Sequence, residues 1–142
     1  MKKILNILFI TFVCVLLCAC GKEEVVGGKT AEINLDGNAT TGYEWKYSLS
    51  DETLLNVVEN EYVPNEAPEE MVGVGGIQKY VFKGLKEGEV IVTLTYSQPW
   101  DTVTEPVYTL KYTFKVDKNN NISLVKKEGT YSSETLPDVV FE

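Results

Sequence analysis

The stretch Tyr108-Thr109-Leu110-Lys111-Tyr112-Thr113-Phe114-Lys115-Val116 has the clearest structural pattern in this chain of 142 residues. Aromatic or aliphatic side chains occupy every second position, and threonine or lysine occupies the positions between them. Successive side chains of a strand point to opposite faces of the sheet. The stretch is therefore predicted to be an antiparallel strand with one buried face and one solvated face.

Five other segments resemble this strand. The alternation recurs over Val90 to Tyr96 and, more briefly, in Ala31-Ile33-Leu35. The remaining three are rich in β-branched and aromatic residues and are Tyr43 to Leu49, Leu54 to Tyr62 and Ile77 to Leu85. Turn-forming residues separate the segments.

The number and spacing of these segments determine the expected fold. Val25-Val26 is expected to begin a first edge strand, which brings the total to about seven short strands. We therefore predict an all-β protein, an immunoglobulin-like antiparallel β-sandwich. Trp45 lies inside one of the strands and is expected to pack in the core between the two sheets.

The C-terminal part of the chain allows two interpretations. A polar, turn-forming run at 117–121 follows Val116, and Ile122-Ser123-Leu124-Val125 comes next, before a mixed tail. The run either closes a hairpin and adds an edge strand or begins a loose extension. The main domain is accordingly assigned to residues 29–116, and residues 117–142 are treated as a C-terminal extension.

The N-terminus has the features of an export signal. Lys2 and Lys3 precede an apolar run from Ile7 to Leu17, which is shorter than the roughly 20 residues that span a bilayer. The following Leu17-Cys18-Ala19-Cys20 resembles a bacterial lipobox, which implies a signal peptide over residues 1–19 and lipidation of Cys20.

That resemblance implies an exported protein, held on the extracytoplasmic side of a bacterial membrane through Cys20, with residues 20–28 carrying the anchor and the first edge strand. The alternatives are an ordinary signal peptide and a short membrane anchor.

Composition excludes several functions. After removal of residues 1–19 the chain has 11 lysines, no arginine and 21 acidic residues, a formal charge of −10. Nucleic acid is therefore not an expected partner, because phosphate binding needs clustered positive charge. Histidine is absent, which excludes Ser-His-Asp and Cys-His catalysis. No cofactor is expected, and a glycosidase with two facing carboxylates is disfavoured.

Three short motifs lie beside predicted strands. They are Asn38-Ala39-Thr40-Thr41-Gly42-Tyr43, Gly73-Val74-Gly75-Gly76 and Gln98-Pro99-Trp100. Connections at one end of a sandwich can converge on one surface, so the three motifs predict a binding edge rather than a catalytic pocket.

The first motif has the composition of a stiff turn. Asn38 can bond neighbouring backbone groups, Thr40 and Thr41 are restricted at χ1, and Gly42 permits a positive φ or a close approach. The segment is predicted to form a thin, rigid wedge. The simpler alternative is an Asx-turn that only joins two strands.

The other two motifs also suggest contact with a partner. Three glycines in four residues lose entropy on ordering, with no packing return expected inside the domain, so we expect Gly73 to Gly76 to present bare backbone. The alternative is a flexible hairpin end. Trp100 follows Pro99 in a loop and is predicted to be an exposed interface anchor. Its alternative is a residue folded back over the end of the sandwich.

The three motifs, in this order, resemble those of the chagasin-like family of cysteine peptidase inhibitors, which has N-P-T-T-G-[FY], G-x-G-G and R-P-W. The resemblance covers roughly Lys29 to Val116. It implies a monomeric, reversible inhibitor whose three motifs occlude the cleft of a papain-like cysteine peptidase. Ala39 replaces the family's proline and Gln98 its arginine, which should leave binding intact but weaker. The competing hypothesis is an adhesive immunoglobulin-like surface module.

Overall fold

The structure, a computed structural model, describes residues 27–142, and within this range it contains nine strands and a single 3₁₀ turn. In chain order the elements are β1 (Gly27–Gly28), β2 (Thr30–Gly37), η1 (Ala39–Thr41), β3 (Glu44–Leu49), β4 (Leu55–Pro64), β5 (Gly76–Gly84), β6 (Gly88–Ser97), β7 (Tyr108–Val116), β8 (Ile122–Thr130) and β9 (Val139–Phe141). The predictions for residues 1–19, for Cys20 and for Val25-Val26 lie outside the described residues.

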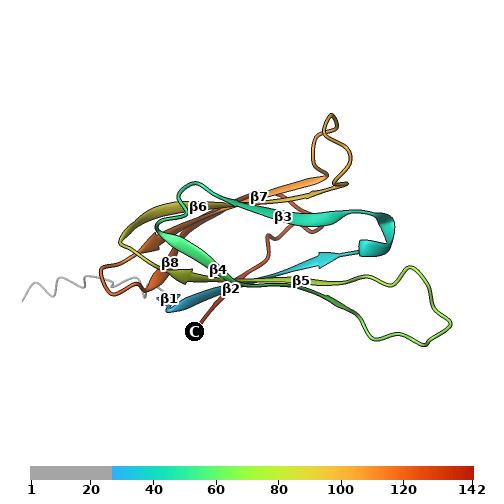
Figure 1. The fold of residues 1–142 in the computed structure, drawn as a ribbon, viewed down its shortest axis with the longest axis horizontal. Coiled ribbons are helices and arrows are strands. Elements are labelled where there is room, and N and C mark those ends of the chain that lie inside the picture. Colours follow the sequence, from blue (N-terminus) through green and yellow to red (C-terminus); the bar gives the residue numbers. More distant parts are fainter. Residues whose placement is uncertain (1–26) are drawn as a thin grey trace, which may run out of the picture.

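The strands form two layers. One sheet has the order β1-β8-β7-β6-β3 and the other β4-β5-β2-β9, and all pairings are antiparallel. Figure 1 shows β3, β6 and β7 in one layer facing β2, β4 and β5 in the other. The predicted all-β antiparallel sandwich is confirmed, with nine strands instead of about seven.

The core lies between the layers and is built from the alternating apolar positions. Its fully buried or nearly buried members are Ala31, Ile33, Leu35, Trp45, Leu55, Tyr80, Phe82, Val90, Val92, Leu94, Leu110, Tyr112, Phe114, Val116 and Ile122. Trp45 is 6% exposed, which confirms its predicted place in the core.

Thr113 departs from the alternation expected for β7. It is buried at 3% exposure, and its hydroxyl oxygen has no hydrogen-bond partner among the described residues. The register between β7 and β8 shifts at Thr113 and Phe114, so that β8 has one residue more than β7 at this point. The expectation that Thr113 lies on a solvated face is therefore wrong, and this exception lies beside the point where β8 bulges.

Residues 117–142 belong to the sandwich. A polar turn joins β7 to β8, which lies between β7 and β1, and β9 pairs with β2 in the opposite sheet. The segment between β8 and β9 is also attached to the body of the fold, because the Tyr112 hydroxyl donates to the Pro137 carbonyl at 2.9 Å. Of the two alternatives for the tail, the structure therefore has the hairpin, and the loose extension is wrong.

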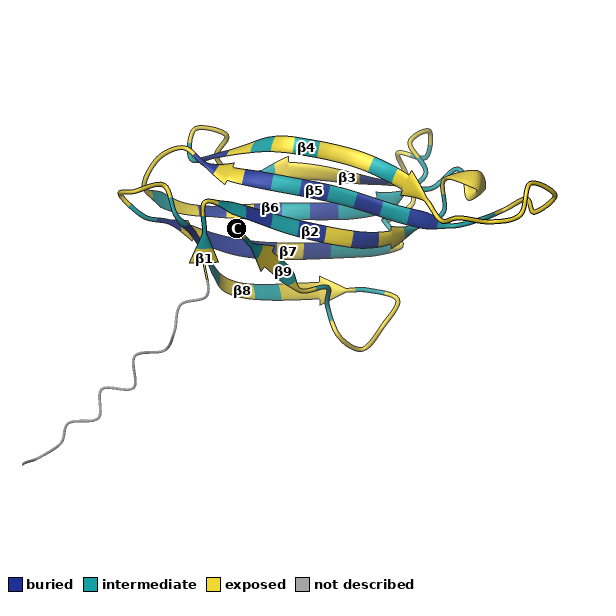
Figure 2. Cartoon of the chain, turned by 90° about the horizontal axis from the view of Figure 1, so that it is seen from below, coloured by how far each residue is buried: buried dark blue, intermediate teal, exposed yellow. Residues whose placement is uncertain are grey.

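The connections divide the molecule into two ends. The loops at 38–43, 65–75, 98–107 and 131–138 lie at one end, here called the loop end, and the turns at 50–54, 85–87 and 117–121 lie at the other, the turn end. Figure 2 shows the longer connections together at one end of the strands. Within the described residues no helix has the length and apolar character needed to cross a membrane.

Candidate functional site

The first motif folds into one short 3₁₀ turn, called here the wedge (residues 38–43). Asn38 caps it: its side-chain oxygen accepts hydrogen bonds from the Thr40 backbone N–H at 3.1 Å and the Thr40 hydroxyl at 2.6 Å. The Thr41 hydroxyl donates to the Asn38 carbonyl at 2.6 Å. Gly42 ends the turn with a φ of +79°, in the left-handed region that favours glycine. The predicted stiff turn is present in these contacts.

The glycine motif lies beside the wedge. The side-chain amide nitrogen of Asn38 donates to the Gly73 carbonyl at 3.0 Å, and Gly73 has a φ of +77°. Gly75 passes close to β2, since a Cβ on it would lie 3.1 Å from the Gly37 carbonyl oxygen. Gly76 is buried, and a Cβ there would meet the Tyr62 ring at 2.7 Å.

The glycines therefore have a packing role inside the domain, and the expectation that they gain nothing from packing is wrong. At Gly76 the neighbouring backbone and the Tyr62 ring leave no room for a side chain, and at Gly75 the approach of the Gly37 carbonyl makes one tight. Gly76 is enclosed within β5, so the exposed part of the motif is Gly73, with Val74 and Gly75 half-buried.

The third motif contacts the wedge from the other side. Trp100 is 68% exposed, yet the edge of its six-membered ring lies over Gly42, where a Cβ would come within 3.2 Å of three ring carbons. The Gln98 side chain donates to the Thr41 carbonyl at 3.5 Å. The Trp100 ring thus rests on the wedge and still exposes most of its surface, and its role as an interface anchor stays a prediction.

The structure brings all three motifs together at the loop end. The wedge is in the middle, joined to the glycine motif through Asn38 and to the tryptophan motif through Thr41 and Gly42. Each contact uses a residue of the motif itself, so the surface is continuous.

Three further exposed apolar side chains at this end were missed by sequence reasoning. Val72 and Val103 are each 92% exposed and Met71 is 60% exposed. Val72 and Met71 precede the glycine motif, and Val103 follows Trp100. Apolar residues inside turn-rich connections are the signal that could have revealed them, because such side chains have no strand face to occupy. They extend the apolar part of the loop-end surface.

The long loop between β6 and β7 has an internal brace. One Asp101 carboxylate oxygen accepts hydrogen bonds from the backbone N–H groups of Val103 at 3.0 Å and Thr104 at 2.9 Å. The hydrogen bonds from Thr104, followed by that from Val103, hold the pKa of Asp101 below its ordinary value. The carboxylate therefore stays charged at neutral pH and fixes the part of the loop that follows Trp100.

The loop end is also acidic. The connections at 65–75 and 98–107 carry five carboxylates and no lysine, namely Glu66, Glu69, Glu70, Asp101 and Glu105. The wedge between them has no charged residue. An uncharged centre flanked by apolar tips and surrounded by negative charge is an arrangement suited to a protein partner.

The fold and the loop end define a β-sandwich whose loops meet in one continuous surface at one end. Residues 24–129 match the family model described as "Chagasin family peptidase inhibitor I42". The chain belongs to the chagasin family of peptidase inhibitors. Proteins of this family are inhibitors and not enzymes, and the family match does not favour the adhesive alternative.

Named proteins are similar to this chain in sequence and in structure. The chain is 36% identical to Amoebiasin-1 of Entamoeba histolytica over 88 residues, which are 61% of this chain and 83% of that protein. It is 32% identical to Chagasin of Trypanosoma cruzi over 80 residues, 54% of this chain and 71% of that protein. The crystal structure of the cysteine protease inhibitor EhICP2 from Entamoeba histolytica resembles it with a TM-score of 0.52 and 30% identity, covering 58% of this chain and 73% of that one.

Proposed function

We propose that this protein is a reversible inhibitor of papain-like cysteine peptidases and that the loop end is its inhibitory surface. The observation that carries the proposal is the position of the wedge, which is bonded to the glycine motif on one side and contacted by Gln98 and Trp100 on the other. A narrow central turn with a loop on each side matches a cleft with two walls. The wedge would enter the cleft while the flanking loops lie on its rims.

The internal bonding of the wedge explains how it could occupy a peptidase without being cut. The Asn38 carbonyl accepts from the Thr41 backbone N–H at 3.1 Å, and the Ala39 carbonyl accepts from the Gly42 N–H at 3.1 Å. Cleavage requires a carbonyl presented to the nucleophile and free to take bonds from the oxyanion hole. The Asn38 and Ala39 carbonyls, which are already bonded within the 3₁₀ turn, do not meet that requirement, so the peptide bonds that follow these two residues would resist cleavage while the wedge blocks the thiol.

Preorganisation should provide much of the affinity. The wedge and Trp100 are already held in place in the free protein, so little conformational entropy remains to be lost on binding. An interface of about 1,600 Å² is sufficient for tight binding under those conditions. The inhibitor would act as a monomer, and the mechanism needs no cofactor.

We further propose that the protein is exported and held at a bacterial membrane by lipid on Cys20. The lipobox-like Leu17-Cys18-Ala19-Cys20 supports this, and so does the place of Gly27, which pairs with Ser123 at the turn end. A chain that enters the fold at the turn end leaves the loop end free. Two or more acyl chains would be needed for stable attachment. Mass spectrometry of the membrane fraction would detect the acylated cysteine, and Cys20→Ser should release the protein.

Titration of papain with the chain tests the inhibitory function. Thr41→Asp places a charge at the centre of the wedge, and Trp100→Ala removes an anchor worth about 2 kcal/mol or more, which is about thirtyfold in affinity. Both side chains are exposed, so the thermal midpoint should stay nearly unchanged. Val125→Ala on β8, which is 52% exposed, is the control and should inhibit like the wild type. Equal inhibition by all four proteins would refute the site, and no inhibition by the wild type would refute the function for this enzyme.

A further inference from the structure

The backbone that leads into the wedge is held by aromatic side chains from four other parts of the chain. The Tyr131 hydroxyl accepts from the Asp36 N–H at 3.0 Å, and the Trp45 indole N–H donates to the Asp36 carbonyl at 2.9 Å. The Tyr96 hydroxyl accepts from the Asn38 N–H at 2.9 Å. The Tyr62 hydroxyl accepts from the Ala39 N–H at 3.4 Å.

These bonds satisfy backbone groups that the sheet does not reach. The pairing of β2 with β5 ends at Gly37 opposite Gly76, so the N–H groups of Asn38 and Ala39 have no strand partner. They also precede the first bonds inside the 3₁₀ turn, which come from Thr41 and Gly42. Unpaired backbone donors near the protein surface would allow the segment to move. Two tyrosine hydroxyls fill this gap.

The Tyr96 hydroxyl is held at a defined position because its ring is packed on three sides. The ring centroid lies 5.0 Å from that of Trp45, 5.4 Å from that of Tyr43 and 5.8 Å from that of Tyr108. The Tyr96 carbonyl also accepts from the Val107 N–H at 2.9 Å, which closes the loop that carries Trp100. This one residue therefore contacts the wedge with its side chain and closes the neighbouring loop with its backbone.

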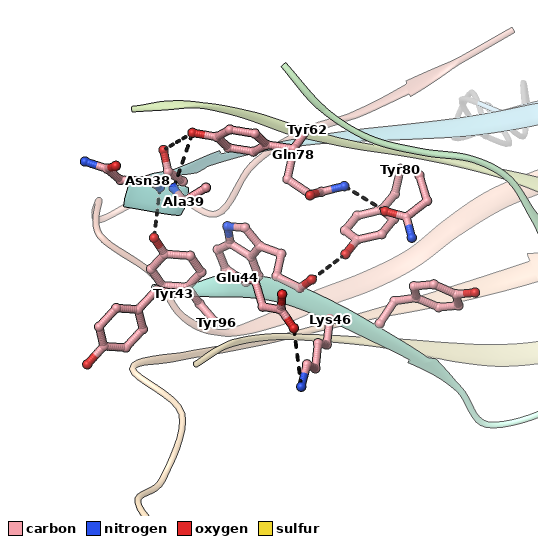
Figure 3. A pocket seen from close by; sticks show the side chains of 13 residues that line it. Asn38, Ala39, Tyr43, Glu44, Lys46, Tyr62, Gln78, Tyr80 and Tyr96 are labelled. Carbon is pink, nitrogen blue, oxygen red and sulfur yellow. Dashed lines mark hydrogen bonds and ion pairs between the residues drawn. The ribbon is translucent and has the colours of Figure 1, made fainter. Parts of the chain in front are cut away.

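Tyr62 supports the wedge from the other sheet. It lies on β4, close to Gly76, and its hydroxyl also reaches the Gly37 carbonyl at 3.5 Å. Figure 3 shows the hydroxyl groups of Tyr62 and Tyr96 converging on Asn38 and Ala39 from opposite sides of a pocket of about 510 Å³. The pocket lies between the edge strands β3 and β4 of the two sheets, directly beneath the wedge.

Resting on the proposed function, we propose that Tyr96 and Tyr62 are positioning residues that hold the wedge in its inhibitory conformation through their hydroxyl groups. Neither belongs to the three motifs, and neither contacts the peptidase in this proposal. Tyr96 has the larger role, because its bond is shorter and its ring is packed against three others. Removal of either hydroxyl frees a backbone donor of the wedge and lowers the fraction of protein that is ready to bind.

The experiment uses the full chain, purified in mild detergent, with Tyr96→Phe, Tyr62→Phe and the double variant. Ser50→Ala is the matched control, because the Ser50 hydroxyl also accepts a hydrogen bond from a backbone N–H, that of Ile91 at 2.8 Å, but at the turn end. Two quantities are measured: hydrogen–deuterium exchange of residues 36–43 in the free protein, and the rates of association with and dissociation from papain. Exchange reports on the wedge whether or not papain is inhibited.

Tyr96→Phe should speed the exchange of the Asn38 backbone N–H. It should also slow association with papain by about three- to tenfold, the range expected for one hydrogen bond. Dissociation should change little, because the cleft holds the wedge once it is bound. The double variant should be slower still, while Ser50→Ala should match the wild type in both measurements. Unchanged exchange at residues 36–43 in Tyr96→Phe would overturn the proposal, and so would a Ser50→Ala effect of equal size. If the wild type does not inhibit papain, the inhibitory function fails separately and exchange alone decides the positioning role.

Discussion

The two ends of the sandwich are held together in different ways. At the turn end, Asp117 accepts hydrogen bonds from the N–H groups of Asn119 at 2.7 Å and Asn121 at 2.9 Å, two and four positions away. Asp51 accepts from the Thr53 N–H at 2.8 Å in the same manner. A carboxylate within each of these turns therefore bonds the backbone of its own turn.

At the loop end the bonds span long stretches of chain. The partners of Ala39, Asn38 and Asp36 lie 23, 58 and 95 positions away in the sequence. The wedge therefore depends on strands of both sheets and on the tail that follows β8. The difference teaches that the shape of the loop end depends on the whole sandwich, whereas the turns at 50–54 and 117–121 each contain a carboxylate that fixes their own backbone. Damage to the core should consequently reach the wedge before it reaches the turns.

The largest expected effect comes from Trp45→Ala. The substitution empties a core position and removes the indole bond to Asp36, so it should lower the free energy of unfolding by about 3–5 kcal/mol. Phe114→Ala, at the fully buried end of β7 nearest the turn end, should lower it by a similar amount. Chemical denaturation measures both losses. Only Trp45→Ala should also weaken inhibition under conditions where both variants are folded, and equal inhibition by the two would break the distinction.

Comparison of Gly42→Ala with Gly73→Ala distinguishes the effect of backbone strain from the effect of a clash with Trp100. Both glycines have a φ near +80°, so alanine should destabilise each site by about 1–2 kcal/mol. A Cβ at Gly42 would push into the Trp100 ring, whereas at Gly73 the nearest atom is the Thr40 hydroxyl at 4.0 Å. Gly42→Ala should therefore reduce inhibition further, with an altered Trp100 fluorescence. A larger loss of inhibition in Gly73→Ala would contradict the observed packing.

Acid should weaken the turn end through Asp117. Hydrogen bonds from Asn121 lower the pKa of Asp117 below its ordinary value, so its contribution to stability is present above about pH 4 and is lost as the pH falls through the lowered pKa. Asp117→Asn keeps the shape of the side chain without the charge. The thermal midpoint of the wild type should exceed that of the variant at pH 7, and the gap should narrow as the pH falls through the lowered pKa and Asp117 becomes protonated. A gap that does not narrow on acidification would refute a role for the charge.

The smallest effect should come from surface charge. Reversing Glu69 and Glu70 to lysine at the loop end should change the association rate with a charged peptidase a few-fold at low salt. The rate should fall for a cleft with basic rims and rise for one with acidic rims, and both changes should vanish near 0.5 M salt. The same reversal of Glu52 and Glu87 at the turn end is the control. Equal effects at both ends would mean that net charge, and not its location, sets the rate.

The contrast between the ends also explains what could be predicted from the sequence. The bounds of β7 were predicted correctly, because alternation is a local pattern, and the cap and positive φ of the wedge follow from Asn38 and Gly42 themselves. The sequence could not show that residues 117–142 form two further strands, because β8 lacks clear alternation and β9 has only three residues. The buried Thr113 depends on a shift in the register of the neighbouring strand.

Within the candidate site, too, local features could be predicted and contacts between distant segments could not. Nothing next to Tyr96 or Tyr62 in the sequence indicates that their hydroxyl groups reach the wedge, since the contacts exist only after the two sheets have packed. The packing role of Gly75 and Gly76 is hidden for the same reason, because the Gly37 carbonyl and the Tyr62 ring arrive from other strands. Contacts between distant segments require the fold, whatever the strength of the local pattern.

Both ends of the described chain lie far from the wedge. Gly27 pairs with β8 near the turn end, and Glu142 exchanges two backbone hydrogen bonds with Thr30, at 2.9 and 3.2 Å, where β2 begins. Strands of eight to ten residues separate these points from the wedge, which is roughly 30 Å at the rise of a strand. Cargo or a solid support attached at Gly27 or at Glu142 would thus stand clear of an enzyme that approaches the wedge.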